Sequence, residues 1–248
     1  MGVFKNILNS NYSWLSFQEV FLFIINYSLV IILARLLNPE AFGTVVLLNL
    51  YTGVFAIMAS LGLDKLIIKN QIRNNIKLSA LLLGVLMVAF VVFIIAIIFL
   101  PLFLNSYLET SEQFLKYGLL SLLSIFTSAL YTFSRALYIR DRKFVKMAKI
   151  LISTYTVSFV LVVIMAYFDR SIFSLLFKQI IIAVLPIITL LYFSKFKFKL
   201  VFSKTILINL FSFSKFITLN NIFNYFVRNI DYFILGKFFS TDIVGQYS

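Results

Sequence analysis

Seven long apolar stretches constrain this sequence more than any other feature. A run of about 20 mostly apolar residues crosses the hydrocarbon core of a bilayer as a helix. Since 62% of the residues are hydrophobic and 12% are charged, a soluble fold could not bury this much apolar surface. We therefore predict an all-α, polytopic transmembrane bundle with about seven spans. These spans are Trp14–Leu37, Phe42–Leu63, Leu78–Leu104, Phe114–Ile139, Ala148–Phe168, Ser171–Phe193 and Phe213–Phe239.

The loops between the predicted spans alternate in charge. Loops on one side of the membrane hold 15 of the 22 Lys and Arg residues, at the N-terminus and at 65–77, 140–149 and 195–215. Because basic loops are retained in the cytoplasm, we expect a multi-pass protein of a bacterial or archaeal plasma membrane with its N-terminus in the cytoplasm. This topology accounts for the net charge of +13, so we expect the lipid bilayer as a partner and no nucleic acid.

Histidine and cysteine are both absent from the sequence. Their absence removes imidazole and thiol chemistry and most zinc sites. The sequence also has no glycine-rich phosphate loop and no catalytic triad pattern. We therefore expect no catalytic residue, no metal and no cofactor, and a protein that is not an enzyme.

An internal repeat joins the two ends of the sequence. Residues 32–43 (ILARLLNPEAFG) match residues 234–245 (ILGKFFSTDIVG) at a constant offset of 202. Each copy has an apolar helix end, a cation, two apolar residues, a polar turn with an acid, and a glycine that opens the next span. The seventh helix therefore repeats the first. Since transporters are commonly built from two equivalent halves with a site at their interface, we expect one whole half and the start of a second, as in a fragment or truncated product.

The repeat also predicts the domain organisation. Residues 1–193 form the first six-helix bundle of a two-bundle transporter, and residues 213–248 form the first helix of the second bundle. Residues 194–212 connect them and alternate Lys with Phe and Leu. Such an amphipathic, basic linker is expected to lie in the cytoplasmic headgroup layer.

Polar residues in the seventh span are the first candidate site. Charges and amides at membrane depth are costly and usually face a cavity or another helix. Asn221, Asn224, Arg228 and Asp231 fall within an arc of roughly 80° on a helix, and Arg228 and Asp231 have the spacing of an ion pair. Two interpretations remain: a cavity wall with a cation for an anionic cargo, or a structural ion pair between helices.

The first span carries Glu19 and Asn26 on one face. The repeat offset relates these residues to Asn221 and Arg228, so both copies present polar groups on the same face. This agreement favours a shared central cavity, although polar packing between the two halves would produce the same pattern.

Two further spans contribute candidate residues. In the fourth, Ser124, Ser128, Tyr131 and Arg135 share a narrow face with two earlier hydroxyl residues, which suits a sugar or phosphate wall or close packing through small residues. In the sixth, Lys178 lies about two turns from the start, where it would line the cavity or extend toward the outer surface.

Four short segments carry a resemblance to a known family: residues 33–43 (LARLLNPEAFG), 60–64 (SLGLD), 134–144 (SRALYIRDRKF) and 228–236 (RNIDYFILG). They resemble segments of the Wzx-like oligosaccharide flippases, which belong to the multidrug/oligosaccharidyl-lipid/polysaccharide exporter superfamily. The resemblance implies two six-helix bundles around a V-shaped cavity. It also implies alternating access for a polyprenyl-pyrophosphate-linked oligosaccharide.

The sequence therefore predicts a transporter of a lipid-linked oligosaccharide, acting in lipopolysaccharide or capsule export. Arg228 and Arg135 would attract the pyrophosphate, and Asn221 and Asn224 would meet sugar hydroxyls. Glu19 or Asp231 could couple transport to an ion gradient. The alternatives are a cation-coupled drug efflux transporter of the same superfamily and a membrane enzyme acting on lipid-linked sugars. Other polysaccharide-assembly proteins would be further partners.

Overall fold

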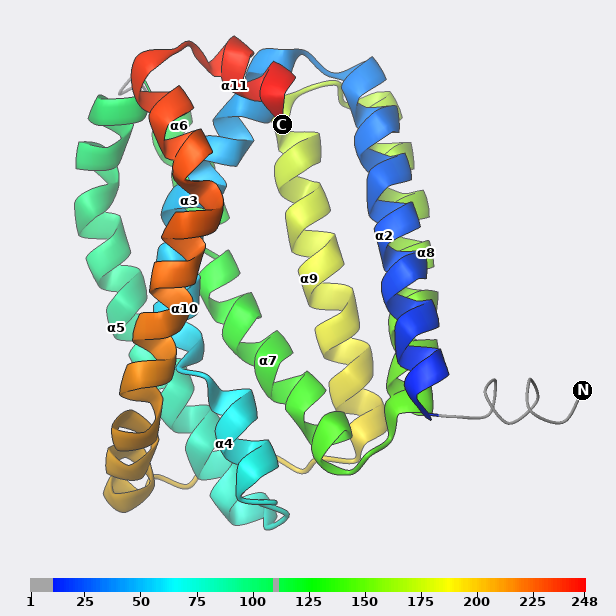
Figure 1. The fold of residues 1–248 in the computed structure, drawn as a ribbon, viewed down its shortest axis with the longest axis vertical. Coiled ribbons are helices and arrows are strands. Elements are labelled where there is room, and N and C mark those ends of the chain that lie inside the picture. Colours follow the sequence, from blue (N-terminus) through cyan, green and yellow to red (C-terminus); the bar gives the residue numbers. More distant parts are fainter. Residues whose placement is uncertain (1–10, 109–111) are drawn as a thin grey trace, which may run out of the picture.

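Long helices make up nearly all of the chain that the computed structural model describes, which is residues 11–108 and 112–248 (Figure 1). No β-strand occurs in these residues. Seven helical stretches among them are long and apolar enough to cross a membrane. The predicted all-α, multi-pass bundle is thus confirmed. The helices are α2 (Asn11–Leu36), α3 (Pro39–Ser60), α4 (Leu63–Lys69), α5 (Asn75–Tyr107), α6 (Glu112–Ser121), α7 (Ser124–Arg140), α8 (Phe144–Phe168), α9 (Ile172–Ser194), α10 (Lys204–Phe238) and α11 (Thr241–Tyr247).

The second span is divided between α3 and α4. Leu61 and Gly62 both adopt left-handed backbone angles, with φ of 48° and 55°, and this conformation ends α3. A glycine is favoured at the second of these positions because it takes positive φ without steric cost. Gly62 also lies under Ile217 of α10, since a Cβ atom there would be 2.8 Å from Ile217 Cγ2.

The fourth span is divided between α6 and α7. At the junction the backbone hydrogen bonds tighten, and Leu123 N–H donates to Leu120 O and Ile125 N–H to Leu122 O. Such a tightened turn changes the direction of a helix. The polar face predicted for one continuous helix, Phe114–Ile139, is therefore divided at this junction, and its α7 part begins at Ser124.

The spans pack in a definite order around α3, α7 and α9. α2 packs on α8, α8 on α9, α9 on α7, and α7 on α3, while α5 and α10 pack on the other side of α3. Buried phenols join these helices: Tyr51 Oη donates to Ala96 O of α5, and Tyr138 Oη donates to Leu190 O of α9 at 2.9 Å. Buried hydroxyls need such partners, so these bonds fix the positions of α3, α5, α7 and α9.

Connections lie alternately at the two ends of the bundle. The α4–α5, α7–α8 and α9–α10 connections lie at one end, which we call the basic end (Figure 1). The α2–α3, α8–α9 and α10–α11 connections lie at the other, which we call the far end. Three basic loops between residues 65 and 215 were predicted to lie on the same side of the membrane. In the structure all three lie at the same end of the bundle.

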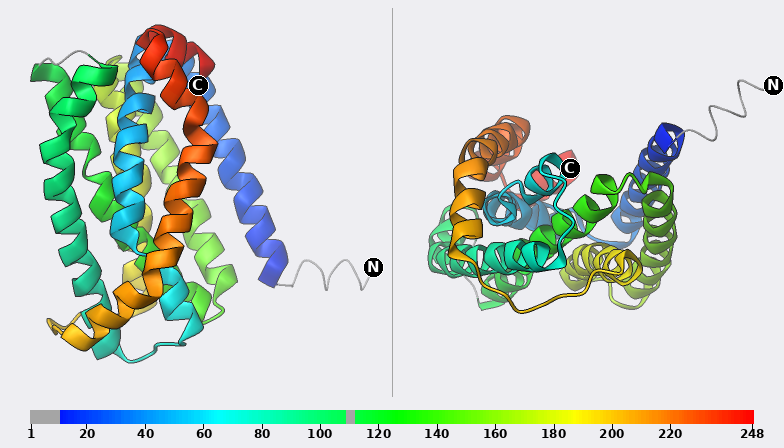
Figure 2. Two further views of the ribbon diagram at one scale, coloured as in Figure 1. Left: turned by 60° about the vertical axis from the view of Figure 1, so that its left-hand side comes forward. Right: turned by 90° about the horizontal axis from the view of Figure 1, so that it is seen from below.

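The predicted linker, residues 194–212, has two parts. α9 ends at Ser194, and the chain is then non-helical until α10 begins at Lys204, earlier than the predicted start at Phe213. Figure 2 shows that the first turns of α10 lie across the bundle, whereas the rest of the helix runs along it.

The two copies of the repeat meet at the far end, where α11 packs on the first turns of α3. A Cβ atom on Gly43 would lie 1.8 Å from Thr241 O, and one on Gly245 would lie 1.8 Å from Pro39 O. Thr241 and Gly245 are the repeat counterparts of Pro39 and Gly43, at the offset of 202. Reciprocal contacts of this kind define a two-fold interface, so the sequence repeat is a pseudo-two-fold relation in space here.

Candidate functional site

Two adjoining cavities open between the central helices. The first, of about 450 Å³, lies toward the far end between α3, α9 and α10. The second, of about 370 Å³, lies between α3, α7, α8 and α9. Asn49 and Gln179 line both cavities. We call the two cavities together the central groove.

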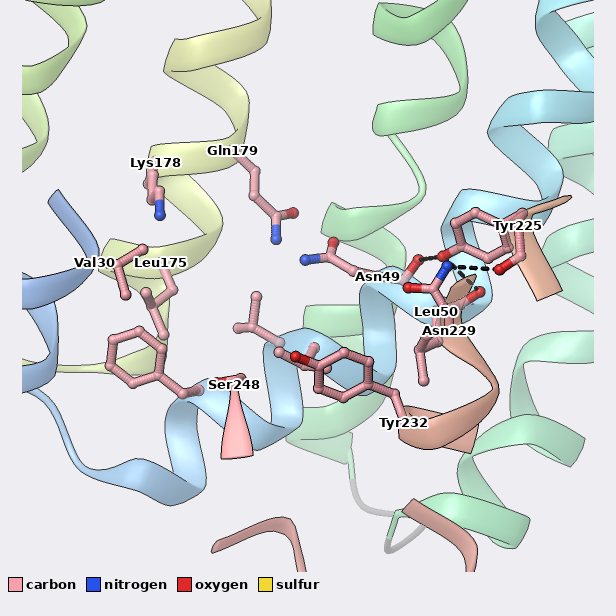
Figure 3. A pocket seen from close by; sticks show the side chains of 13 residues that line it. Val30, Asn49, Leu50, Leu175, Lys178, Gln179, Tyr225, Asn229, Tyr232 and Ser248 are labelled. Atoms are coloured by element: carbon pink, nitrogen blue, oxygen red, sulfur yellow. Dashed lines mark hydrogen bonds between the residues drawn. The ribbon is translucent and has the colours of Figure 1, made fainter. Parts of the chain in front are cut away.

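Amide and phenol groups dominate the polar lining of the first cavity. Figure 3 shows Lys178 and Gln179 extending from α9, with the carboxamide of Asn49 directed toward Gln179. The α10 side of the cavity is formed by Tyr225, Asn229 and Tyr232. These groups can donate and accept hydrogen bonds, so the cavity suits a ligand rich in hydroxyl groups.

Tyr225 fixes how α10 lies against α3. Its hydroxyl donates to Asn49 O at 2.9 Å, and Asn229 Nδ2 donates to Tyr225 O at 2.7 Å (Figure 3). The ring lies over Gly53, because a Cβ atom at that position would be 2.3 Å from the Tyr225 hydroxyl oxygen. The absence of a side chain on Gly53 therefore determines which residues of α10 face the groove.

Among the described residues, Lys178 is the only charged side chain in the lining of the two cavities. No acid in that part of the chain lies within 4.0 Å of its ammonium group. A charge at membrane depth is costly unless water or an opposite charge compensates it. Of the two predicted positions for Lys178, the structure shows the one in the cavity, where its ammonium group can meet an anionic ligand.

Hydroxyl groups line the second cavity. Ser124, Ser128 and Tyr131 of α7 all contribute, as does Tyr155 of α8. Ser128 Oγ donates to Ile125 O at 3.0 Å and reaches Ala56 O of α3 at 3.3 Å. Ser124 Oγ is buried and has no hydrogen-bond partner within residues 11–108 and 112–248.

Arg135 lies one turn beyond Tyr131 on α7, toward the basic end. Its guanidinium group is 5.6 Å from the centre of the Tyr131 ring, and its buried Nε has no hydrogen-bond partner in the described part of the chain. Arg135 and Glu19 both lie close enough to Tyr155 to act on it electrostatically. The structure thus brings Tyr131 and Arg135 together, beside the second cavity.

Comparison with known protein families identifies the chain. Residues 32–248 match the family described as polysaccharide biosynthesis protein. The chain belongs to this family. The match includes α3, α7, α8, α9 and α10, which form most of the lining of the central groove, and it agrees with the resemblance to Wzx-like flippases. Comparison with curated proteins and with solved structures gave no match.

The central groove differs from the cavity wall predicted along α10. Asn221, Asn224, Arg228 and Asp231 do not line either cavity, and Asn224 and Arg228 are exposed. The residues that face the groove lie about 90° around the helix from the predicted stripe. Contact between Tyr225 and Gly53 sets this rotation.

Two more expectations about polar pairs are corrected. Arg228 and Asp231, both of which the structure describes, form no ion pair, because Asp231 Oδ2 accepts a hydrogen bond from the Tyr247 hydroxyl at 3.0 Å instead. Asn26 is half-buried on α2 and lines neither cavity. Asn26, Arg135 and Arg228 therefore do not converge on one chamber as predicted.

Sequence reasoning did not select as site residues Asn49, Tyr155, Gln179, Tyr225, Asn229 or Tyr232. One signal was present in the sequence: Tyr225, Asn229 and Tyr232 recur at i, i+4 and i+7, the spacing of one helix face.

The described residues contain no cluster of three or more acidic side chains that could hold a metal ion.

Proposed function

We propose that this polysaccharide biosynthesis protein moves a lipid-linked oligosaccharide from the cytoplasmic to the outer leaflet of the cell membrane. Its role is transport, with no catalytic residue assigned. The central groove carries the proposal, because it places amide, hydroxyl and phenol groups at membrane depth. The same groove contains the ammonium group of Lys178, which no acid of the described residues pairs. Sugar hydroxyls would form with these groups the hydrogen bonds that a bilayer cannot offer.

Two cations are placed to attract the phosphate groups of the cargo. Lys178 lies in the first cavity, and Arg135 lies beside the second with an unsatisfied Nε. Ionised donors form the strongest hydrogen bonds to phosphate oxygens. Arg228, on the exposed face of α10, is a weaker candidate for this role.

The basic end of the bundle is assigned to the cytoplasm. Lys and Arg are concentrated in its loops, and such loops are retained on the cytoplasmic side during membrane insertion. The first cavity, near the far end, would then be closer to the outer leaflet, and Arg135 would be closer to the cytoplasm. A cargo entering from the cytoplasm would meet Arg135 before it meets Lys178.

A vesicle assay tests the proposal. The full chain is reconstituted with a fluorescent polyprenyl-pyrophosphate-linked oligosaccharide, and a membrane-impermeant quencher reports how fast the label crosses. Wild type should cross faster than empty vesicles, and N49L/Q179L, which removes the two amides shared by both cavities, should reduce the rate by about tenfold or more. As a control, K65Q changes an exposed residue of α4 and should leave the rate unchanged. Equal rates for wild type and N49L/Q179L would contradict the role of the groove, and a wild-type rate equal to that of empty vesicles would contradict the activity.

A further inference from the structure

The basic end carries a second surface with the features of a ligand site. We call residues 195–212 the basic strap: the non-helical segment 195–203 and the first turns of α10. The strap leaves α9 at Ser194, runs along one edge of the basic end, and continues into the part of α10 that lies across the bundle (Figure 2). This surface lies outside the central groove, so any ligand that it binds is independent of the transport proposal.

The strap is attached to the bundle at two points. The Phe196 ring packs 5.1 Å from the Phe133 ring of α7, and Lys199 N–H donates to Ser79 Oγ of α5 at 3.0 Å. Ser79 is completely buried, so its hydroxyl holds the backbone of the strap against the end of the bundle. These attachments fix the strap at the depth where α9 ends and α10 begins.

Leu210 of the strap is buried in the bundle, but five other apolar side chains beyond Phe196 are exposed. They are Phe198, Leu200, Phe202, Ile208 and Phe211, which are 49%, 84%, 59%, 58% and 48% exposed. At 35 residues, α10 is roughly 52 Å long by its helical rise, which exceeds a hydrocarbon core of about 30 Å. Its first turns must therefore lie outside the core, where exposed apolar side chains meet the boundary between headgroups and acyl chains.

The charges of the strap are also uncompensated. Lys195, Lys197, Lys199 and Lys204 are exposed, and none lies within 4.0 Å of an acid in the described residues. The nearby acid Asp141 is already paired with Arg140 at 2.8 Å and with Lys143 at 2.9 Å. Four free ammonium groups beside five exposed apolar side chains match one partner in both charge and polarity: an anionic lipid surface.

We propose that the basic strap is a binding site for anionic phospholipid. The ammonium groups bind lipid phosphates, while the apolar side chains insert at the acyl boundary. Because each basic residue near an anionic surface contributes about 1 kcal/mol, roughly fivefold in affinity, the strap should prefer anionic over neutral lipid by fivefold or more.

Lipid quenching tests this site directly. The chain contains no cysteine, so Leu200→Cys provides a single attachment point for an environment-sensitive fluorophore on the full-length protein. The labelled protein is reconstituted in vesicles containing brominated phosphatidylglycerol or brominated phosphatidylcholine, and the ratio of the two quenching constants gives the lipid preference. We expect a ratio of about five or more, which falls as salt screens the charges.

A matched pair of variants distinguishes a site from general charge. Lys195→Gln, Lys197→Gln and Lys199→Gln together should bring the ratio close to one. Lys65→Gln, Arg73→Gln and Lys77→Gln remove the same charge from exposed positions at the same end and should leave the ratio unchanged. The proposal is overturned if wild type shows equal quenching by both lipids, or if the control triple variant loses as much preference as the strap variant.

Discussion

At the scale of single residues, Lys178 is the clearest candidate for contact with an anionic cargo. A hydrogen bond to a charged group contributes about 1.5–3 kcal/mol, equivalent to roughly 10- to 100-fold in rate. We therefore expect Lys178→Gln to reduce the initial rate of the vesicle assay by at least tenfold. Arg228→Gln removes the same charge from an exposed position on α10 and should have a smaller effect. A larger loss for Arg228→Gln would show that α10 presents its predicted stripe to the cargo after all.

The carboxylate of Asp141 stabilises the fold at the basic end. Arg140 donates to it through Nε at 2.8 Å and also donates to Ile72 O, so this carboxylate helps to hold the α7–α8 turn to the loop before α5. The hydrogen bond from Arg140, followed by that from Lys143, lowers the pKa of the Asp141 carboxyl. A lowered folded-state pKa means that this stabilisation is present above the unfolded value and is lost as pH falls through the folded value.

A variant can test this pH dependence. We expect Asp141→Asn to lower the free energy of unfolding at neutral pH by roughly 1 kcal/mol or less, and to lower the thermal unfolding temperature modestly as a result. The difference from wild type should begin to shrink as pH falls below about 4 and should vanish below the lowered folded-state pKa of Asp141. Asp64→Asn, at the same end but outside any ion pair of the described residues, is the control. A deficit for Asp141→Asn that stays constant in acid would rule out the carboxylate as its cause.

At the scale of elements, the crossing of α3 and α11 is the contact most sensitive to side-chain size. Backbone meets backbone there, because Cβ atoms on Gly43 or Gly245 would lie 1.8 Å from carbonyl oxygens of the other helix. Neither carbonyl can rotate away as a side chain could. We expect Gly43→Ala to separate the two helices and to cost about 1–3 kcal/mol, as overpacking usually does.

Spin labels can measure that separation. Glu40→Cys and Asp242→Cys place labels on α3 and α11, at positions related by the repeat offset of 202. The distance between the labels should increase when Gly43→Ala or Gly245→Ala is added, and by similar amounts, because the two contacts are reciprocal. Gly118→Ala is the control, since its Cβ would meet only the flexible side chain of Leu100. An unchanged distance in both crossing variants would contradict the close packing.

At the scale of the whole molecule, the alternation of its connections makes topology testable. The chain has no cysteine, so single cysteines can be placed at Arg142, in the α7–α8 turn at the basic end, and at Asp169, in the α8–α9 connection at the far end. In intact cells a membrane-impermeant maleimide should label Asp169→Cys, and should reach Arg142→Cys only after the cells are permeabilised. The reverse pattern would place the basic end outside and contradict the proposed direction of transport.

Individual helices differ in how far the sequence predicts their part of the site. Ser124, Ser128 and Tyr131 were expected on a common wall, and they line the second cavity because α7 is regular from Ser124 onward. On α10 the lining of the groove and the predicted stripe are different faces, although its residues are equally periodic. Both polar faces of α10 satisfy the sequence pattern, and only the contact of Tyr225 with Gly53 selects one of them.

The sequence by itself determined the number of spans, their order, the segregation of basic loops and the repeat that relates the two ends of the chain. These properties follow from apolar length, local charge and residue identity, none of which depends on distant contacts. Only the tertiary structure decided how each helix is rotated about its axis, and therefore that Asn49, Lys178 and Gln179 face a groove while Arg228 does not. The physical reason is that helix rotation is set by close packing between helices far apart in sequence, where one missing side chain, at Gly53, admits a neighbouring ring.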